Sequence, residues 1–227
     1  MQQWLRYSIG AHAGLLLGMG LGRFSYTPII PMIIQSNQLT PEETGYIGAI
    51  NLSGYICGAL LLPTLRNWSS EPKLIRICFI VGLFALFASI APLGFFWLAF
   101  WRFCLGVLVA IIMILCIAYV TKFAPKNRLA LATSISFTGV GAGVLISSSI
   151  LPYLLKFGLE WAWAGSAIIG LFATIVGLWC WRGAPNLEAS ISLNNASQQK
   201  LSNSGRKLVL VQALFSIGLI PHSIYWV

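Results

Sequence analysis

Charged side chains are scarce in this sequence of 227 residues, and acidic ones are the scarcest. Asp, Glu, Lys and Arg together make up 8% of the chain, and Asp is absent altogether. Soluble domains carry roughly 25% charged residues. A chain with so little charge cannot cover a water-facing surface. This excludes a soluble globular protein, and it excludes a separate soluble catalytic or nucleic-acid-binding domain.

The shortage of acids also removes most catalytic and metal-binding arrangements. The five acidic residues are all glutamates and are expected in loops: Glu42, Glu43, Glu71, Glu160 and Glu188. Neither an H-E-x-x-H nor a G-x-S-x-G motif is present, and the five cysteines lie in apolar stretches without a C-x-x-C pair. We therefore expect no enzyme, no cofactor and no metal site.

Long apolar runs are what the sequence has instead. Hydrophobic residues make up 58% of the chain, and the mean hydropathy is +0.83. About 20 apolar residues span the hydrocarbon of a bilayer as a helix, and no alternating segments typical of a barrel are seen. The sequence predicts an all-α polytopic membrane protein in a lipid bilayer. Its expected spans are residues 7–34, 44–65, 74–92, 95–121, 129–154, 160–181 and 208–227.

The basic residues alternate between the connections. They are concentrated before the first span and in the even connections, whereas the odd connections hold only Lys156 together with Glu42, Glu43 and Glu160. Basic loops stay on the cytoplasmic side, so we expect a cytoplasmic N-terminus. The net charge of +9 is then explained by topology, and nucleic acid is not an expected partner.

The loops also indicate a division of the chain. Residues 1–182 hold six expected spans with short connections, and residues 183–207 form a polar stretch rich in Ser, Asn and Gln. Such polar segments behave as flexible linkers. Residues 208–227 are the seventh expected span.

Two motifs connect this layout to a known family. Leu98, Arg102, Gly106 and Ala110 follow the pattern l-x-x-x-R-x-x-q-G-x-g-a-A of the major facilitator superfamily, with Leu105 in place of its Gln. The stretch G-L-G-R-F-S-Y-T-P at residues 20–28 resembles the YbfB/YjiJ-type uncharacterised bacterial branch of that superfamily. The loop motif after the second span departs from the pattern, because Leu62 stands where its Asp belongs.

The resemblance implies a fold, a mechanism and a location. The fold would be a six-helix N-terminal bundle of the major facilitator type, built from two inverted three-helix repeats, plus a seventh transmembrane helix that starts an absent second bundle. The mechanism would be alternating access for a small solute in the bacterial cytoplasmic (inner) membrane. Because one bundle is missing, we expect a chain truncated after the first half. The alternatives are a non-transporting membrane protein and a half-transporter that pairs with itself or with a second chain.

Two arginines inside expected spans are the main candidates for a solute site. Arg23 and Arg102 lie between the outer leaflet and the midplane, where a charge is costly and usually functional. Two guanidinium groups without embedded carboxylates suit an anionic substrate. The alternative for Arg102 is a structural role, in which it binds helix carbonyls or extends toward the membrane surface.

Uncharged polar residues near these arginines are further candidates. Tyr26 and Thr27 follow Arg23 by three and four residues and share its helix face. Asn51 in the second span either lines the cavity or bonds to a neighbouring helix. His222, which follows Pro221 in the seventh span, is favoured over His12 as a titrating group. We expect Arg23, Tyr26, Thr27, Asn51, Arg102 and His222 to line a solute site.

Overall fold

The structure is a computed structural model that describes residues 2–187, 207, 210 and 211. The chain divides into two compact units, Met1–Asn186 and Leu187–Val227, and the description below concerns the first. Most of the expected linker, the expected seventh span and His222 lie outside the described residues. Within the described part of the chain, every regular element is a helix.

The first expected span consists of three consecutive pieces. It comprises α1 (Gln3–Leu15), the π-helix η1 (Leu16–Leu21) and, after a turn at residues 22–25, α2 (Tyr26–Gln35). The sequence predicts a kink near Pro28 and Pro31, and the structure interrupts the helix just before them.

The other described helices match the expected apolar runs and extend some of them. They are α3 (Pro41–Trp68), α4 (Glu71–Ala88), α5 (Phe95–Phe123), the short 3-10 helix η2 (Lys126–Arg128), α6 (Leu129–Leu155) and α7 (Leu159–Cys180). Four stretches among them are long and apolar enough to cross a membrane: Pro41–Trp68, Phe95–Phe123, Lys126–Leu155 and Leu159–Cys180. For the residues that the structure describes, the expected all-helical class is confirmed, with helices long and apolar enough for a membrane protein.

Local sequence signals explain where these helices begin. Before α3, the Thr40 hydroxyl accepts a hydrogen bond from the Glu43 amide, and the Glu43 carboxylate accepts one from the Thr40 amide. This capping box starts α3 three residues before its apolar run. Gly94 and Gly158 precede α5 and α7 with φ of 85° and 128°, a left-handed region that glycine adopts without strain.

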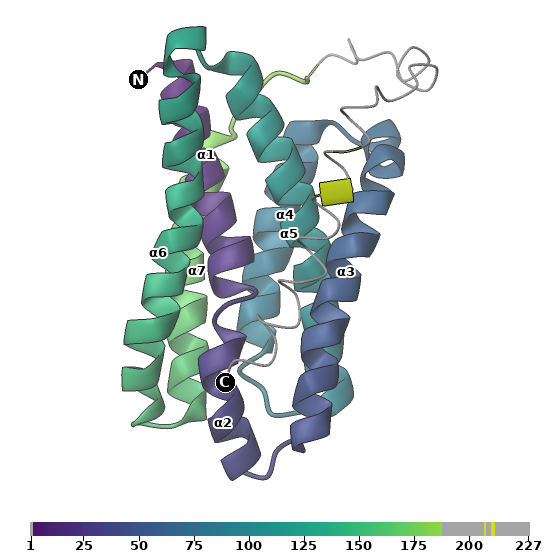
Figure 1. Cartoon of the computed structure of the whole chain (residues 1–227), viewed down its shortest axis with the longest axis vertical. Coiled ribbons are helices and arrows are strands. Elements are labelled where there is room, and N and C mark those ends of the chain that lie inside the picture. The colour runs from purple at the N-terminus through teal and green to yellow at the C-terminus, as the bar shows by residue number, and fades with distance from the viewer. Residues whose placement is uncertain (1, 188–206, 208–209, 212–227) are drawn as a thin grey trace. The chain divides into compact units, whose positions relative to one another are not determined.

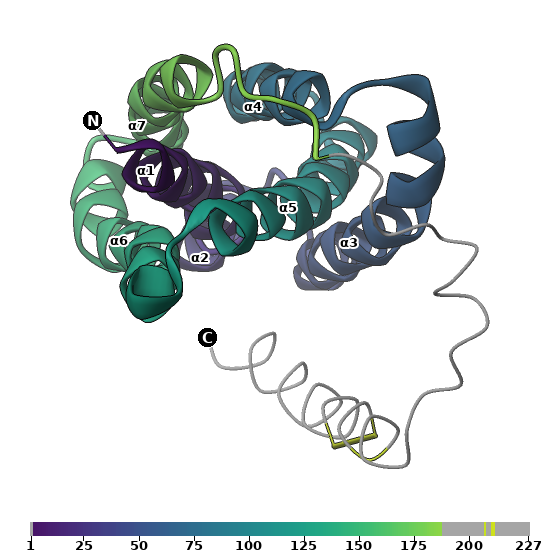
Figure 2. The same ribbon diagram turned by 90° about the horizontal axis from the view of Figure 1, so that it is seen from above.

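The helices run up and down, so that the connections gather at two ends (Figure 1). One end holds the start of α1, the α3–α4 and α5–α6 connections and the end of α7. We call it the basic end, because Arg6, Arg66, Lys126 and Arg182 lie there. The other end holds the remaining connections, and we call it the acidic end, after Glu42, Glu43 and Glu160. Viewed along the bundle, α1 lies between α5, α6 and α7 (Figure 2).

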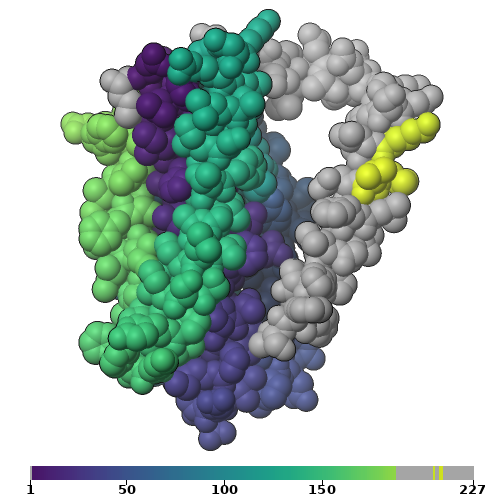
Figure 3. All heavy atoms as spheres, turned by 60° about the vertical axis from the view of Figure 1, so that its left-hand side comes forward, coloured from purple at the N-terminus to yellow at the C-terminus, as the bar shows by residue number. Residues whose placement is uncertain are grey.

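Glycines allow two pairs of helices to touch along their backbones. A Cβ atom at Gly106 of α5 would overlap the Asn51 carbonyl of α3, and one at Gly54 would overlap the Phe103 carbonyl of α5. Gly20 of η1 and Gly143 of α6 meet in the same way. Figure 3 shows α6 as a continuous column beside α1 and α7. Small residues at such crossings are typical of membrane helix packing.

Candidate solute site at the break in the first span

The break in the first span arises from its backbone hydrogen bonds. The amide of Gly22 donates to the Leu17 carbonyl at 2.9 Å, and that of Phe24 donates to Met19 at 3.3 Å, each five residues back. Pro28 has no N–H to donate and its ring excludes the carbonyl of the residue four before it. The chain therefore leaves the helix at residues 22–25. Such π-type interruptions are frequent at functional sites.

Arg102 of α5 reaches this break from the neighbouring helix. Its side chain is only 1% exposed, and its Nη1 donates to the Gly22 carbonyl at 2.9 Å. The guanidinium carbon lies 4.9 Å from the ring centroid of Tyr26 and 4.7 Å from that of Trp163. Contacts of this kind between a guanidinium and aromatic rings are attractive. Arg102 thus joins α5, the break and α7.

Two of the nitrogens of Arg102 remain unpaired. Its Nε and Nη2 are buried and have no hydrogen-bond partner among the described residues. Buried polar groups in proteins are almost always paired. The bond to Gly22 is what we expect if Arg102 has a structural role and binds helix carbonyls. The unpaired nitrogens are what we expect if Arg102 binds a solute.

Arg23 lies in the turn at the break itself and is half-buried. Its guanidinium carbon is 5.9 Å from the Phe24 ring centroid, and Tyr55 of α3 lies in its neighbourhood. The Tyr55 hydroxyl contacts the Met113 sulfur of α5 at 3.4 Å. In the described part of the chain, no hydrogen bond or ion pair engages the Arg23 guanidinium. Among the described residues, this positive charge at the break has no counter-charge.

The other expected site residues are placed as follows. The Tyr26 hydroxyl donates to the Thr44 carbonyl at 3.0 Å, while its ring faces Arg102. Asn51 donates from Nδ2 to the Arg102 carbonyl at 2.7 Å, which is the bond to a neighbouring helix. Thr27 is half-buried on α2. The structure thus brings Tyr26 and Asn51 to Arg102, while His222 lies outside the described residues.

His12, the less favoured histidine, lies on α1 away from the break. Its Nδ1 is 3.0 Å from the Thr138 hydroxyl and 3.3 Å from the Ile135 carbonyl of α6. This contact joins two helices near the basic end.

Sequence reasoning missed Trp163. It is 3% exposed on α7 and also lines a cavity of about 90 Å³ at the acidic end, together with Gln38, Leu98 and Glu160. The signal in the sequence was weak, because Trp161 and Trp163 are two of the nine tryptophans of the chain. Only its place in a buried cluster with Tyr26 and Leu98 distinguishes Trp163 from the exposed Trp161.

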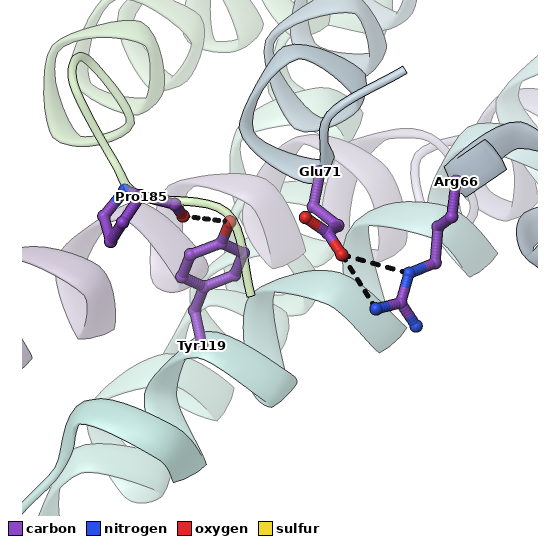
Figure 4. Close-up of polar contacts among 4 residues, drawn as sticks. All are labelled: Arg66, Glu71, Tyr119 and Pro185. Carbon is purple, nitrogen blue, oxygen red and sulfur yellow. Dashed lines mark hydrogen bonds and ion pairs between the residues drawn. The ribbon is translucent and has the colours of Figure 1, made fainter. Parts of the chain in front are cut away.

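Arginines at the basic end have partners of a different kind. The Nε and Nη2 of Arg66 both donate to one carboxylate oxygen of Glu71, at 3.1 and 2.7 Å (Figure 4). Glu71, expected in a loop, is the buried first residue of α4. Arg6 donates from Nε to the Cys180 carbonyl at 2.7 Å and from Nη2 to the Arg182 carbonyl.

The fold defines a helical, multi-pass membrane protein with buried and half-buried arginines at a helix break. Comparison with known families identifies it further. The chain belongs to the family described as uncharacterised MFS-type transporter YbfB, whose model matches residues 15–227. This match confirms the resemblance that the motifs predict. The chain therefore belongs to a family of membrane transporters.

Two curated proteins are similar to the chain. A benzoate transport protein of Acinetobacter baylyi (strain ATCC 33305 / BD413 / ADP1) is 27% identical over 154 residues, which cover 63% of this chain and 33% of that protein. A protein of Arabidopsis thaliana named sugar transporter ERD6-like 15 is 27% identical over 180 residues, 77% of this chain and 34% of that protein. The chain therefore matches about a third of the length of these relatives.

Proposed function

We propose that the chain is the first bundle of a transporter that moves a small organic anion by alternating access. In this proposal residues 1–182 form six spans in two inverted three-helix repeats, residues 183–207 a cytoplasmic linker, and residues 208–227 a seventh span. The family supports this arrangement. The division of the first span into α1, η1 and α2 supports counting it as one crossing, because the three pieces follow one another from the basic end to the acidic end (Figure 1).

The proposed location is the bacterial cytoplasmic membrane, with the basic end in the cytoplasm. The gathering of Arg6, Arg66, Lys126 and Arg182 at one end supports this orientation, since basic loops stay on the cytoplasmic side. The proposal includes no enzymatic step.

The unpaired charge of Arg23 is the observation that supports an anionic substrate. A half-buried guanidinium in a membrane helix is costly unless a partner balances it, and within the described residues it has no carboxylate partner. A negatively charged solute would supply one. The similar benzoate transport protein makes benzoate, an aromatic carboxylate, the first probe to test.

The remaining site residues take supporting roles in this proposal. Arg102 adds positive charge and holds the break open through Gly22. Tyr26 and Asn51 position Arg102, while Thr27 offers a hydroxyl one turn after Arg23. His222 is proposed as the group that takes up or releases a proton.

Alternating access requires a second bundle that moves against the first. We propose that it is supplied by a second chain or by a second copy of this one. Disulfide or chemical crosslinking in membranes reports whether copies pair. Crosslinked pairs in working vesicles support this part of the proposal, and transport by vesicles that hold only isolated single chains overturns it.

The test is uptake of radiolabelled benzoate into vesicles that contain the purified chain, compared with vesicles without protein. We expect saturable uptake that Arg23→Gln lowers by tenfold or more, because one charge-assisted contact is worth about 1.5 to 3 kcal/mol. Arg76→Gln, at an exposed arginine of α4, is the matched control and is expected to leave uptake unchanged. Equal uptake with Arg23→Gln and with the original chain would contradict the anion site.

A further inference from the structure

The unpaired nitrogens of Arg102 lie on one edge of its guanidinium. Nε–H and Nη2–H point in nearly parallel directions, and this edge is the part of arginine that grips both oxygens of a carboxylate. In Arg66 the same two nitrogens bind Glu71, and in Arg6 they bind two backbone carbonyls. Arg102 donates from its other nitrogen, Nη1, to the Gly22 carbonyl, and this edge has no partner among the described residues.

The surroundings of that edge make an unpaired state costly. Arg102 is 1% exposed, so water does not solvate the charge. The described residues contain one ion pair, that of Arg66 and Glu71, so no carboxylate of this part of the chain neutralises Arg102. A buried charge needs both a counter-charge and hydrogen bonds. The missing partner must therefore be an acceptor with negative charge that comes from outside the described residues.

Two of the residues that line the cavity at the acidic end are neighbours of Arg102. Leu98 and Trp163 line it, and Leu98 precedes Arg102 by one turn of α5. Trp163 both lines the cavity and covers the guanidinium, with 4.7 Å between its ring centroid and the guanidinium carbon. Glu160 lines the cavity one turn before Trp163 on α7. A movement of the Trp163 ring would connect the cavity with the guanidinium.

We propose that the Nε–Nη2 edge of Arg102 binds the carboxylate of a small monocarboxylic acid, which enters from the acidic end past Trp163. The rings of Tyr26 and Trp163 on the guanidinium provide apolar walls that suit an organic acid better than a strongly hydrated inorganic ion. The inference rests on the proposed function, because it names the chemical class of the solute and the group that grips it.

The first experiment measures binding at equilibrium and requires no transport. The full chain is placed in nanodiscs of phosphatidylethanolamine and phosphatidylglycerol, and titrated calorimetrically with benzoate and with benzamide, which has a similar shape and no charge. We expect saturable benzoate binding and at least tenfold weaker binding of benzamide. Equal affinities for benzoate and benzamide would overturn the proposal. This test uses the original chain, so its result does not depend on whether a variant folds.

The second experiment distinguishes the two parallel hydrogen bonds of Arg102 from electrostatic attraction alone. Arg102→Lys keeps the charge and loses the two parallel N–H bonds, so we expect benzoate affinity to fall about tenfold or more. Arg76→Lys is the matched control, and its affinity is expected to stay within twofold. Benzoate affinity that is unchanged in a folded Arg102→Lys protein would overturn the bidentate contact.

The third experiment tests the entry route. Glu160→Gln removes a negative charge from the cavity, so benzoate should associate about twice as fast at low salt, and the gain should vanish at high salt. Glu42→Gln removes an exposed charge at the same end that does not line the cavity. Equal association rates for the two variants would overturn the route. Binding without uptake would contradict the proposed transport alone, while uptake with unaltered affinity in Arg102→Lys would contradict this inference alone.

Discussion

The basic end and the break in the first span both contain a buried aromatic group next to an arginine, but they differ in how the arginine is paired. At the basic end, Tyr7 stacks on Trp181 with ring centroids 5.3 Å apart, and Arg6 beside them binds two carbonyls at the end of α7. At the break, the rings of Tyr26 and Trp163 lie against Arg102, and two of its three guanidinium nitrogens have no partner among the described residues. At the basic end Arg6 is therefore paired within the chain, whereas at the break Nε and Nη2 of Arg102 have no partner among the described residues.

The difference also concerns how the two regions are tied together. The Tyr119 hydroxyl donates to the Pro185 carbonyl at 2.7 Å, so that the segment after α7 is held against α5 (Figure 4). At the break, Arg102 donates to the Gly22 carbonyl, in a turn where the regular helix bonds are interrupted.

The largest expected effect comes from the helix contact that carries Arg102. Gly106→Leu would place a side chain against the Asn51 carbonyl, in a crossing with no space for it. We expect a loss of stability of about 3 kcal/mol or more, seen as little or no folded protein by size-exclusion chromatography in detergent. Gly141→Leu, at an exposed glycine with nothing within 4 Å of the added Cβ, is the control. A folded Gly106→Leu protein would disprove the close crossing of α3 and α5.

The next effect in size concerns the ring that covers Arg102. Trp163→Ala removes a buried ring and leaves a cavity, which costs about 3 to 5 kcal/mol in protein cores. Trp161→Ala, two residues away and 61% exposed, should change stability by about 0.5 kcal/mol or less. Denaturant unfolding in mixed micelles measures both. Similar values for the two variants would show that Trp163 does not pack as described.

A direct comparison of the two arginines follows. Arg6→Met should lower the free energy of unfolding by about 1 to 3 kcal/mol, because it leaves two carbonyls of the α7 end without donors. Arg102→Met, without benzoate, should stay within about 1 kcal/mol of the original chain or exceed it, because it removes a buried charge that lacks a counter-charge. Thermal unfolding of both variants tests this. A larger loss for Arg102→Met than for Arg6→Met would reverse the comparison.

The smallest effect is expected for the ion pair between α3 and α4. The side chain of Arg66 is 40% exposed, and pairs of this kind contribute about 0 to 1 kcal/mol. Arg66→Gln should therefore shift the unfolding midpoint slightly, and the shift should shrink at high salt. A loss as large as that of Arg6→Met would show that this pair is a main element of the basic end.

The sequence predicts the membrane helices well because their apolar runs are long and lipid leaves few alternatives to a helix. It predicts their ends less well. The α3 helix begins at Pro41 rather than at residue 44, because the Thr40–Glu43 capping box adds a polar turn outside the apolar run. The break lies before Pro28 because a proline disturbs the turn that precedes it.

The candidate site could also be predicted only in part. Because a charged side chain in lipid is energetically costly, the sequence alone identifies Arg23 and Arg102 as candidates. The partners of Arg102 depend on how α5, α7 and the break pack, so that neither Trp163 nor the unpaired edge is visible in a linear pattern. For Asn51 the sequence leaves two roles open, and the structure gives it a bond to the Arg102 carbonyl.

The most direct test of the account observes the Nε–H group of Arg102 itself. The chain has eight arginines, and labelling them with ¹⁵N gives one Nε–H signal for each, with that of Arg102 assigned as the signal lost in Arg102→Lys. Addition of benzoate should move the Arg102 signal downfield, as expected for a new charge-assisted hydrogen bond, and leave the signals of Arg6 and Arg66 in place. An Arg102 signal that does not change at saturating benzoate, or one that changes equally with benzamide, would contradict the carboxylate site.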